Sequence, residues 1–314
     1  MLFGQAFSEL MVHKLIAFLR LSRPLFLFGG VLLYALGALI ARYQGSAINV
    51  GLYWRGQLSV TALQLMTHYL NEYWDVETDS LNRNRTPFSG GSGVLVHGEL
   101  PRETAFTAAM VCLAIAMAAA SWLIFTSAVP LSVWVILLLG FIGAYFYSSP
   151  PLMLSSTGYG ELTTSIVVAG LVPALGHVVQ SRQLSFLVLL ATAPLVLLHL
   201  AMLLAFEFPD LLSDEAAGKR TLLVRVGCHI GAKLHNALIL LALSLTSAAT
   251  CIGLPAQVAL AVVLTSPLAL LQISLVRRLQ RGDSISFAHL TFLGLLLFVL
   301  AVSFTALSFW TIGT

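Results

Sequence analysis

Nine long apolar runs constrain the fold of this chain more than any other feature of its sequence. A helix needs about 20 mainly apolar residues to cross the hydrocarbon core of a bilayer. No polar run between these segments is long enough to build a soluble domain, and the mean hydropathy is +0.93. We therefore expect an all-α integral membrane bundle of nine transmembrane helices that forms a single domain over 1–314. The runs lie at 24–42, 57–75, 104–125, 131–148, 160–180, 186–206, 234–253, 256–276 and 288–310.

The basic residues indicate which way this bundle faces. With the N-terminus placed in the cytosol, successive connections alternate sides, and of the 16 Lys and Arg residues only Arg42, Arg55 and Arg182 fall outside. Cytosolic segments of membrane proteins are enriched in Lys and Arg. The sequence therefore predicts a cytosolic N-terminus and an external C-terminus. Residues 1–23 mix charged and apolar side chains without a signal-peptide cleavage site, and we expect them to form an interfacial helix.

Acidic residues are concentrated in two short stretches at the predicted cytosolic ends of the second and sixth runs. A charged group near the bilayer centre costs roughly 2.5–3.5 kcal/mol, so such residues normally line a polar cavity or its mouth. Two acidic groups also repel each other unless a cation lies between them, which points to a metal ion. The stretches hold eight of the 13 Asp and Glu residues: Glu72, Asp75, Glu77 and Asp79 in NEYWDVETD, and Glu207, Asp210, Asp214 and Glu215 in EFPDLLSDEAAGKRT.

Within each stretch, key polar residues are spaced four apart. Asn71, Asp75 and Asp79 follow this spacing, and Asp210 and Asp214 repeat it. Each step of four advances a side chain by about 40° around a helix, so each set lies along one narrow stripe. Carboxylate oxygens are hard ligands suited to Mg²⁺, which also bridges to substrate phosphates. Solvated helix-end carboxylates are the simpler interpretation of one such pair, whereas two pairs on one face favour a shared Mg²⁺ site.

Basic residues follow both acidic stretches and would supply the rest of an anion site. Lys219 follows Asp214, and Arg83 and Arg85 follow Asp79. An arginine can donate two hydrogen bonds to a phosphate, and a lysine acts as a point charge. The alternative is that these residues are ordinary cytosolic anchors. Acid, metal, phosphate and base together are expected where a diphosphate is held and then leaves.

These motifs resemble those of the UbiA superfamily of intramembrane prenyltransferases. NEYWDVETD is similar to the NDxxDxxxD signature, and DLLSDEAAGKRTLLVRVG is similar to the second DxxxD motif with its GKxTLxVRxG tail. The resemblance covers nearly the whole chain and implies nine helices with both motifs at the cytosolic face. It further implies that the motif residues bind Mg²⁺ and the diphosphate of a polyprenyl donor, namely Asn71, Asp75, Asp79, Asp210 and Asp214, with Lys219 and either Arg83 or Arg85 completing the diphosphate site.

Other segments resemble particular parts of the superfamily. YFYSSPPLMLSSTGYGEL and RTPFSGGSGVL look most like the menaquinone branch, whose acceptor is 1,4-dihydroxy-2-naphthoate. Two positions depart from the family pattern. Glu72 stands where the first motif usually has Asp, which leaves its role as a metal ligand open. Tyr147 begins a YxxxK element in which Pro151 replaces the lysine, so either Tyr147 acts alone at the diphosphate or another basic residue supplies that contact.

Two further residues are candidates for the acceptor side. Arg23 resembles a family arginine near the acceptor pocket, and the alternative is an anchoring arginine at a helix start. Glu161 begins the fifth run and is a candidate to orient an acceptor, the alternative being an interfacial acid at a helix N-terminus.

Together these features predict an enzyme, a prenyltransferase that uses Mg²⁺ to transfer a polyprenyl group from its diphosphate to an aromatic acceptor. The expected acceptor is 1,4-dihydroxy-2-naphthoate in menaquinone biosynthesis. The expected surroundings are a lipid bilayer, with several crossings of a prokaryotic inner or cell membrane and no nucleic acid as partner. The alternatives are 4-hydroxybenzoate or another acceptor, a terpene cyclase on the same scaffold, and an ion-coupled transporter. The acids lie at one face and not at the midplane, which disfavours the transporter.

Overall fold

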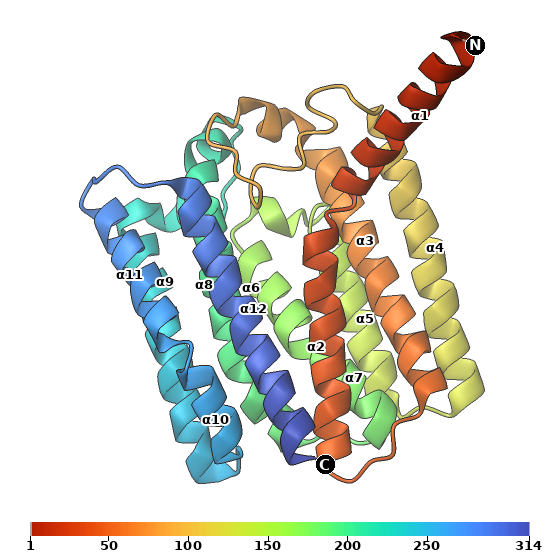
Figure 1. Ribbon diagram of the computed structural model, residues 1–314, viewed down its shortest axis with the longest axis vertical. Helices are drawn as coiled ribbons and strands as arrows, with labels where there is room; N and C mark the ends of the chain where they lie inside the picture. The colour runs from red at the N-terminus through yellow and green to blue at the C-terminus, as the bar shows by residue number, and fades with distance from the viewer. Residues whose placement is uncertain (1, 314) are drawn as a thin grey trace.

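The computed structural model describes the backbone of residues 2–313 and the side chains of residues 9–313, and over this range the chain is helical without a strand (Figure 1). The α-helices are α1 (Leu2–Leu21), α2 (Pro24–Tyr43), α3 (Val50–Leu81), α4 (Arg102–Ser127), α5 (Leu131–Tyr145), α6 (Gly160–Ile166), α7 (Val172–Ser181), α8 (Phe186–Ala216), α9 (Leu222–Ala249), α10 (Ala256–Val263), α11 (Ser266–Gln280) and α12 (Phe287–Ile312). Three short segments join them: η1 (Leu154–Ser156), η2 (Val167–Leu171), which is a π-helical turn, and η3 (Thr250–Ile252).

Each predicted apolar run lies in one helix or in consecutive helical segments. In the described chain, seven of these are long and apolar enough to cross a membrane. The other two are α3, which polar residues interrupt, and α5, which has 15 residues. An all-helical bundle with several membrane-spanning helices is therefore confirmed, while the count of nine crossings and the orientation stay predictions.

Both motif-bearing helices continue beyond the predicted apolar runs. The runs end at residues 75 and 206, whereas α3 continues to Leu81 and α8 to Ala216. Hydropathy marks where the apolar side chains stop, but backbone hydrogen bonding carries each helix further. The acidic motifs therefore lie on helical turns, and the fourfold spacing does place their residues on one helix face.

The largest apolar core is centred on α8. Leu195 and Leu204 of this helix have no exposed surface, and they belong to one cluster with Leu33 of α2 and Ala301 of α12. Side chains on the outside of the bundle are also apolar, and Phe125 and Leu131 each expose 77 % of their surface. Within a lipid bilayer close packing replaces the hydrophobic effect as the force that holds helices together. This distribution agrees with a bundle surrounded by lipid.

Small residues bring α2 and α7 into close contact. A β-carbon added at Gly37 of α2 would collide with the carbonyl oxygen of Pro173, and one at Gly176 of α7 would collide with that of Tyr34. Glycines at such crossings let two backbones approach closely in membrane proteins. This contact fixes α2 beside the fifth apolar run.

The ends of several helices meet at one end of the bundle, where residues 82–101 run across them (Figure 1). The last turns of α3 and α8 and the first turn of α9 lie there. Asn82, just after α3, donates a hydrogen bond of 2.7 Å to Asp210 Oδ1 on α8. At the same end α1 projects away from the bundle and is attached through Arg20, which donates two hydrogen bonds of 2.9 Å to Glu99. The two acidic motifs are thus neighbours in space.

Candidate active site

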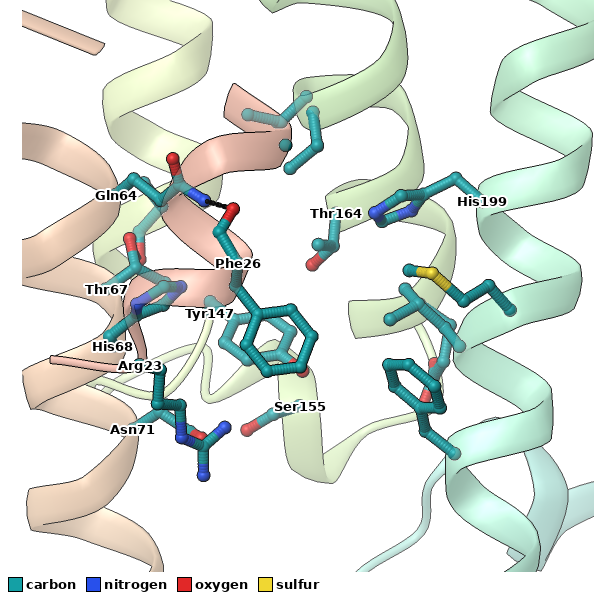
Figure 2. A pocket seen from close by; sticks show the side chains of 18 of the residues that line it. Arg23, Phe26, Gln64, Thr67, His68, Asn71, Tyr147, Ser155, Thr164 and His199 are labelled. Atoms are coloured by element: carbon teal, nitrogen blue, oxygen red, sulfur yellow. Dashed lines mark hydrogen bonds between the residues drawn. The ribbon is translucent and has the colours of Figure 1, made fainter. Parts of the chain in front are cut away.

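A cavity of about 350 Å³ opens at this end and continues into the bundle. Its lining on α3 runs from Ser59 to Asp79, a helix length of roughly 30 Å at 1.5 Å per residue. All four motif aspartates line it, and its deeper wall is largely apolar. In Figure 2, residues of α3 form one wall, and His199 of α8 faces them across the cavity. The cavity therefore joins a charged mouth to an apolar interior.

The first acidic row is tightly hydrogen-bonded. Asn71 donates to Asp75 Oδ2 at 2.6 Å and to Ser148 Oγ at 3.2 Å. Lys219 Nζ forms an ion pair of 2.9 Å with Asp75 Oδ1, so both oxygens of Asp75 have partners. Asp79 lies one turn further along α3 and lines the cavity beside Gly91.

The second acidic row lies opposite, on α8. Asp210 accepts hydrogen bonds from Asn82 at 2.7 Å and from the backbone N–H of Gly90 at 3.2 Å. Asp214 is one turn further on, is 7 % exposed and lines the cavity. Segment 82–93 follows α3, which carries the first row, and donates hydrogen bonds to Asp210 of the second row. It therefore connects the two rows, a role that its glycine-rich sequence does not reveal.

Lys219 lies between the two rows. Its side chain is 13 % exposed. Burial lowers the pKa of this ammonium group, but the carboxylates of Asp75 and Asp214 raise it by more, so its pKa lies above the usual value. Part of the positive charge expected between the rows is therefore supplied by the protein itself.

The residues at the cavity mouth fit a divalent cation that arrives with a phosphate ligand. Among the described side chains, no three of His, Cys, Asp or Glu converge as a preformed metal cage. Mg²⁺ does not require one, because it keeps several waters and commonly binds through one or two carboxylates together with substrate phosphates. Four aspartates line this mouth, and the ammonium of Lys219 cannot neutralise them all. The oxygen donors and the excess negative charge both suit Mg²⁺.

The two candidate arginines of segment 82–93 do not line the cavity. Arg83 is exposed, and Arg85 donates a hydrogen bond of 2.9 Å to the backbone carbonyl of Asp79. Arg85 thus holds the segment against the end of α3. The structure does not bring either guanidinium to the position at which the sequence analysis expected a phosphate contact.

Glu72 forms an ion pair with Arg23 and accepts hydrogen bonds from segment 82–93. Arg23 lines the cavity, and its Nη2 lies 2.7 Å from Glu72 Oε1. Ser92 donates to both oxygens of Glu72, from its backbone N–H and from its hydroxyl, each at 2.7 Å. Glu72 is 3 % exposed and does not line the cavity. The geometry therefore gives this motif glutamate a structural contact to the segment.

Tyr147 and Glu161 both line the cavity, as does Glu207, whose role the sequence analysis did not identify. Tyr147 projects into the cavity between the walls in Figure 2. Glu161 begins α6 and is 7 % exposed, and its Oε1 accepts a hydrogen bond from the N–H of Leu222. Glu207 lies three residues before Asp210 in the sequence. Residues at this spacing share one face of a helix, so the sequence does contain a signal for Glu207.

Hydrogen-bonded polar residues, which the sequence does not identify as site residues, line the deeper part of the cavity. Gln64 donates a hydrogen bond of 2.8 Å to the carbonyl of Phe26, marked in Figure 2, and His68 contacts the carbonyl of Ser22 at 3.1 Å. His199 Nδ1 lies 3.0 Å from Ser165 Oγ. These contacts fasten the helix ends around the cavity, and no short-range motif in the sequence announces them.

Comparison with known proteins gives a consistent result. A 1,4-dihydroxy-2-naphthoate octaprenyltransferase of Bacillus subtilis is 25 % identical over 68 % of this chain and 66 % of its own length, just under two thirds. A solved structure of a digeranylgeranylglyceryl phosphate synthase matches 95 % of this chain and 99 % of that one with a TM-score of 0.65 at 14 % identity. A UbiA homologue from Archaeoglobus fulgidus, bound to GPP and Mg²⁺, matches 92 % and 99 % with a TM-score of 0.60 at 17 % identity.

At these identities the solved structures show a shared fold. The family assignment has broader support, because residues 30–296 match the UbiA prenyltransferase family. That range contains both acidic motifs and most of the residues that line the cavity. The expectation of a prenyltransferase is thereby confirmed at the level of the family: this chain belongs to the UbiA prenyltransferase family.

Proposed function

We propose that this protein transfers a polyprenyl group from polyprenyl diphosphate to 1,4-dihydroxy-2-naphthoate in a reaction that requires Mg²⁺. The observation that carries the proposal is a single cavity with two rows of aspartate at its mouth and a long apolar interior. This shape suits a molecule with a charged diphosphate at one end and a hydrocarbon tail at the other. The Bacillus relative supports the choice of acceptor, and the homologue bound to GPP and Mg²⁺ supports the donor and the metal.

The diphosphate would lie between the two acidic rows. Asp75, Asp79, Asp210 and Asp214, with Asn71, would hold Mg²⁺, which when bound offsets the charge that grows on the leaving diphosphate. Lys219 would turn from Asp75 to a phosphate oxygen and add a charge-assisted hydrogen bond. Tyr147 would place its hydroxyl group beside the same phosphate. We retain Arg85 only as the residue that fastens segment 82–93, because its guanidinium binds the end of α3.

The prenyl group would lie in the deeper part of the cavity. As the carbon–oxygen bond breaks, positive charge develops on an allylic carbon, and aromatic faces stabilise a cation without offering a nucleophile. Phe206 is central here, since it packs edge-on against Phe26 at 6.2 Å and stacks with Phe88 at 6.3 Å, and all three line the cavity. On the acceptor side, Arg23 would attract the acceptor's carboxylate, and Glu161 would orient its ring.

The cellular setting follows from the substrates. A polyprenyl diphosphate resides in the bilayer, and a quinone product would stay there, so we place the enzyme in a prokaryotic cell or inner membrane with its acidic rows facing the cytosol. The outward-facing apolar surface of the bundle suits that location.

Product analysis tests the proposal directly. Purified protein would receive geranyl diphosphate, Mg²⁺ and either 1,4-dihydroxy-2-naphthoate, 4-hydroxybenzoate or no acceptor, with mass spectrometry of the products. We expect a prenylated naphthoate and an equal amount of diphosphate, both lost on addition of EDTA or in Asp75→Ala and Asp210→Ala at normal expression. Cyclised hydrocarbon formed without an acceptor would establish a terpene cyclase instead. Product from 4-hydroxybenzoate alone would change the acceptor, and retained activity in either aspartate variant would remove the metal assignment.

A further inference from the structure

Two buried carboxyl groups in the cavity remain unexplained by metal or diphosphate binding. Glu207 on α8 lies three residues before Asp210, about 4.5 Å deeper along the helix axis. Glu161, from the first turn of α6, lies beside it, because successive backbone N–H groups of α9 bind the two carboxyl groups. Both line the cavity. This pair, Glu161–Glu207, therefore lies just beneath the aspartate rows.

The pair is held by the N-terminus of α9. The backbone N–H of Leu222 donates to Glu161 Oε1 at 3.2 Å, and that of Leu223 donates to Glu207 Oε2 at 2.7 Å. Leu222 and Leu223 lie in the first turn of α9, which the non-helical backbone of Gly227 (φ +76°) separates from the longer part of this element. One oxygen of each carboxyl group is thus fixed, and the orientation of the other follows.

The remaining oxygens have no donor. Glu161 Oε2 and Glu207 Oε1 are buried, and no N–H or O–H group of the described residues reaches them. Each of these oxygens can therefore accept a hydrogen bond from a ligand in the cavity.

Capping of α9 accounts for only one oxygen of each carboxyl group. Thr221 already caps the helix, because its hydroxyl oxygen accepts the N–H of Val224. A buried polar oxygen without a donor destabilises a fold. Two such oxygens side by side in a cavity wall therefore indicate a ligand group that satisfies them.

Neighbouring groups restrict what that ligand can be. Glu207 lies on α8 between Asp210 and the apolar lining residues Met202 and Leu203, which places the pair between the diphosphate end and the prenyl end of the cavity. This is the level at which the reacting carbon of the donor would lie. Carboxylate oxygens offer no N–H donor to an acceptor's carboxylate, but they accept a hydrogen bond from its hydroxyl group.

We propose that the Glu161–Glu207 pair binds the ring hydroxyl of the aromatic acceptor and takes up its proton as the ring attacks; this assignment rests on the proposed function. The carbon–oxygen bond of the donor breaks with its electron pair going to the diphosphate. A ring carbon forms the new carbon–carbon bond, the acceptor's O–H bond supplies the electrons for a ring carbonyl, and the proton goes to the carboxylate. The acceptor's carboxyl group then leaves the attacked carbon as CO₂, its bonding electron pair restores the aromatic ring, and the ring oxygen takes the proton back from the pair.

Glu207→Gln and Glu161→Gln test this role with little change in shape, since the amide oxygen can still accept the N–H of α9. Glu215→Gln is the control on the same helix, because Glu215 is exposed and does not line the cavity. The assay uses geranyl diphosphate and 1,4-dihydroxy-2-naphthoate, with binding of the unreactive geranyl S-thiolodiphosphate measured separately. We expect kcat to fall about 100-fold in both pair variants, the range for loss of a general base, with donor affinity within about threefold of wild type. The control should match wild type.

An acceptor series separates proton transfer from a structural effect. Naphthoates with electron-withdrawing fluorine substituents have more acidic hydroxyl groups and depend less on a base. The deficit of Glu207→Gln relative to wild type should therefore shrink along this series. An equal deficit with every acceptor, a parallel loss of donor affinity, or near-normal turnover in both pair variants would overturn the assignment. Wild-type protein that yields no prenylated acceptor at all would instead overturn the proposed function.

Discussion

At the residue scale, the site pairs side chains of opposite charge before any ligand binds. Lys219 sits beside Asp75, and the carboxylates of the two rows keep its pKa above the usual value of 10.5. The lysine is therefore charged at neutral pH. The stability that its raised pKa contributes is present below pH 10.5 and is lost as the pH rises through that raised pKa.

Replacement of this lysine should affect the donor far more than the acceptor. A hydrogen bond to a charged group contributes about 1.5–3 kcal/mol, so Lys219→Ala should weaken donor affinity about 10- to 100-fold. Acceptor affinity should change little, and the effect should be constant between about pH 6 and pH 9, where the lysine stays charged. Lys233→Ala, an exposed lysine away from the cavity, is the control. Isothermal titration with geranyl S-thiolodiphosphate measures the change, and an unaltered affinity would argue against a phosphate contact.

At the element scale, segment 82–101 does more than join two helices. Its first part binds Asp210 through Asn82 and Gly90, and Ser92 is fixed by Glu72. Gly91 has a φ of +73° and lies so close to Asp79 that an added β-carbon would collide with that carboxylate. The segment therefore sets the position of both acidic rows.

Two glycine substitutions separate this contact from backbone strain. Gly91→Ala and Gly98→Ala both place alanine in left-handed backbone, which costs roughly 1–2 kcal/mol. Only Gly91→Ala would push Asp79 aside, since nothing lies within 4 Å of the β-carbon position at Gly98. We expect similar losses of thermal stability, but a raised Mg²⁺ requirement for turnover only in Gly91→Ala. Equal Mg²⁺ titrations for the two variants would show that Gly91 does not position the aspartate.

The sequence predicts part of this site and misses the rest for physical reasons. Fourfold spacing identifies Asp75, Asp79, Asp210 and Asp214, because residues four apart share a helix face wherever the helix lies. Glu207 escapes, because its partner Glu161 is 46 positions away and only tertiary packing brings them together. Arg83 and Arg85 are misjudged because they belong to an irregular segment, where sequence spacing does not determine direction.

At the scale of the whole molecule, hydropathy alone locates the helices, and their packing creates the cavity. The apolar runs identify each helical segment because every backbone polar group in a bilayer must be hydrogen-bonded within the structure. Hydropathy cannot reveal how the helices pack. An example is the close contact of α2 and α7 at Gly37 and Gly176. The count of nine crossings rests on the apolar runs, and the cytosolic position of both motifs rests on the distribution of basic residues.

Single-cysteine labelling tests the orientation. In a background with Cys112, Cys228 and Cys251 replaced, Gln183→Cys should react with a membrane-impermeant maleimide in intact cells, because 182–185 is predicted to face outward. Asn84→Cys, exposed in segment 82–101, should react only after permeabilisation. If both cysteines are labelled under the same condition, or if only Asn84→Cys is labelled in intact cells, the predicted topology is wrong.

The central claim is that the two acidic rows bind one Mg²⁺–diphosphate together, and a double-mutant cycle of donor affinity tests it most directly. Titrations with geranyl S-thiolodiphosphate and Mg²⁺ would compare Asp75→Asn, Asp214→Asn and the double variant. Residues that act on one ligand show interaction energies of about 0.5–3 kcal/mol, whereas independent sites are additive. We predict that either substitution removes most of the Mg²⁺-dependent affinity and that the second adds little. Strictly additive losses, or full affinity without Mg²⁺, would contradict the account.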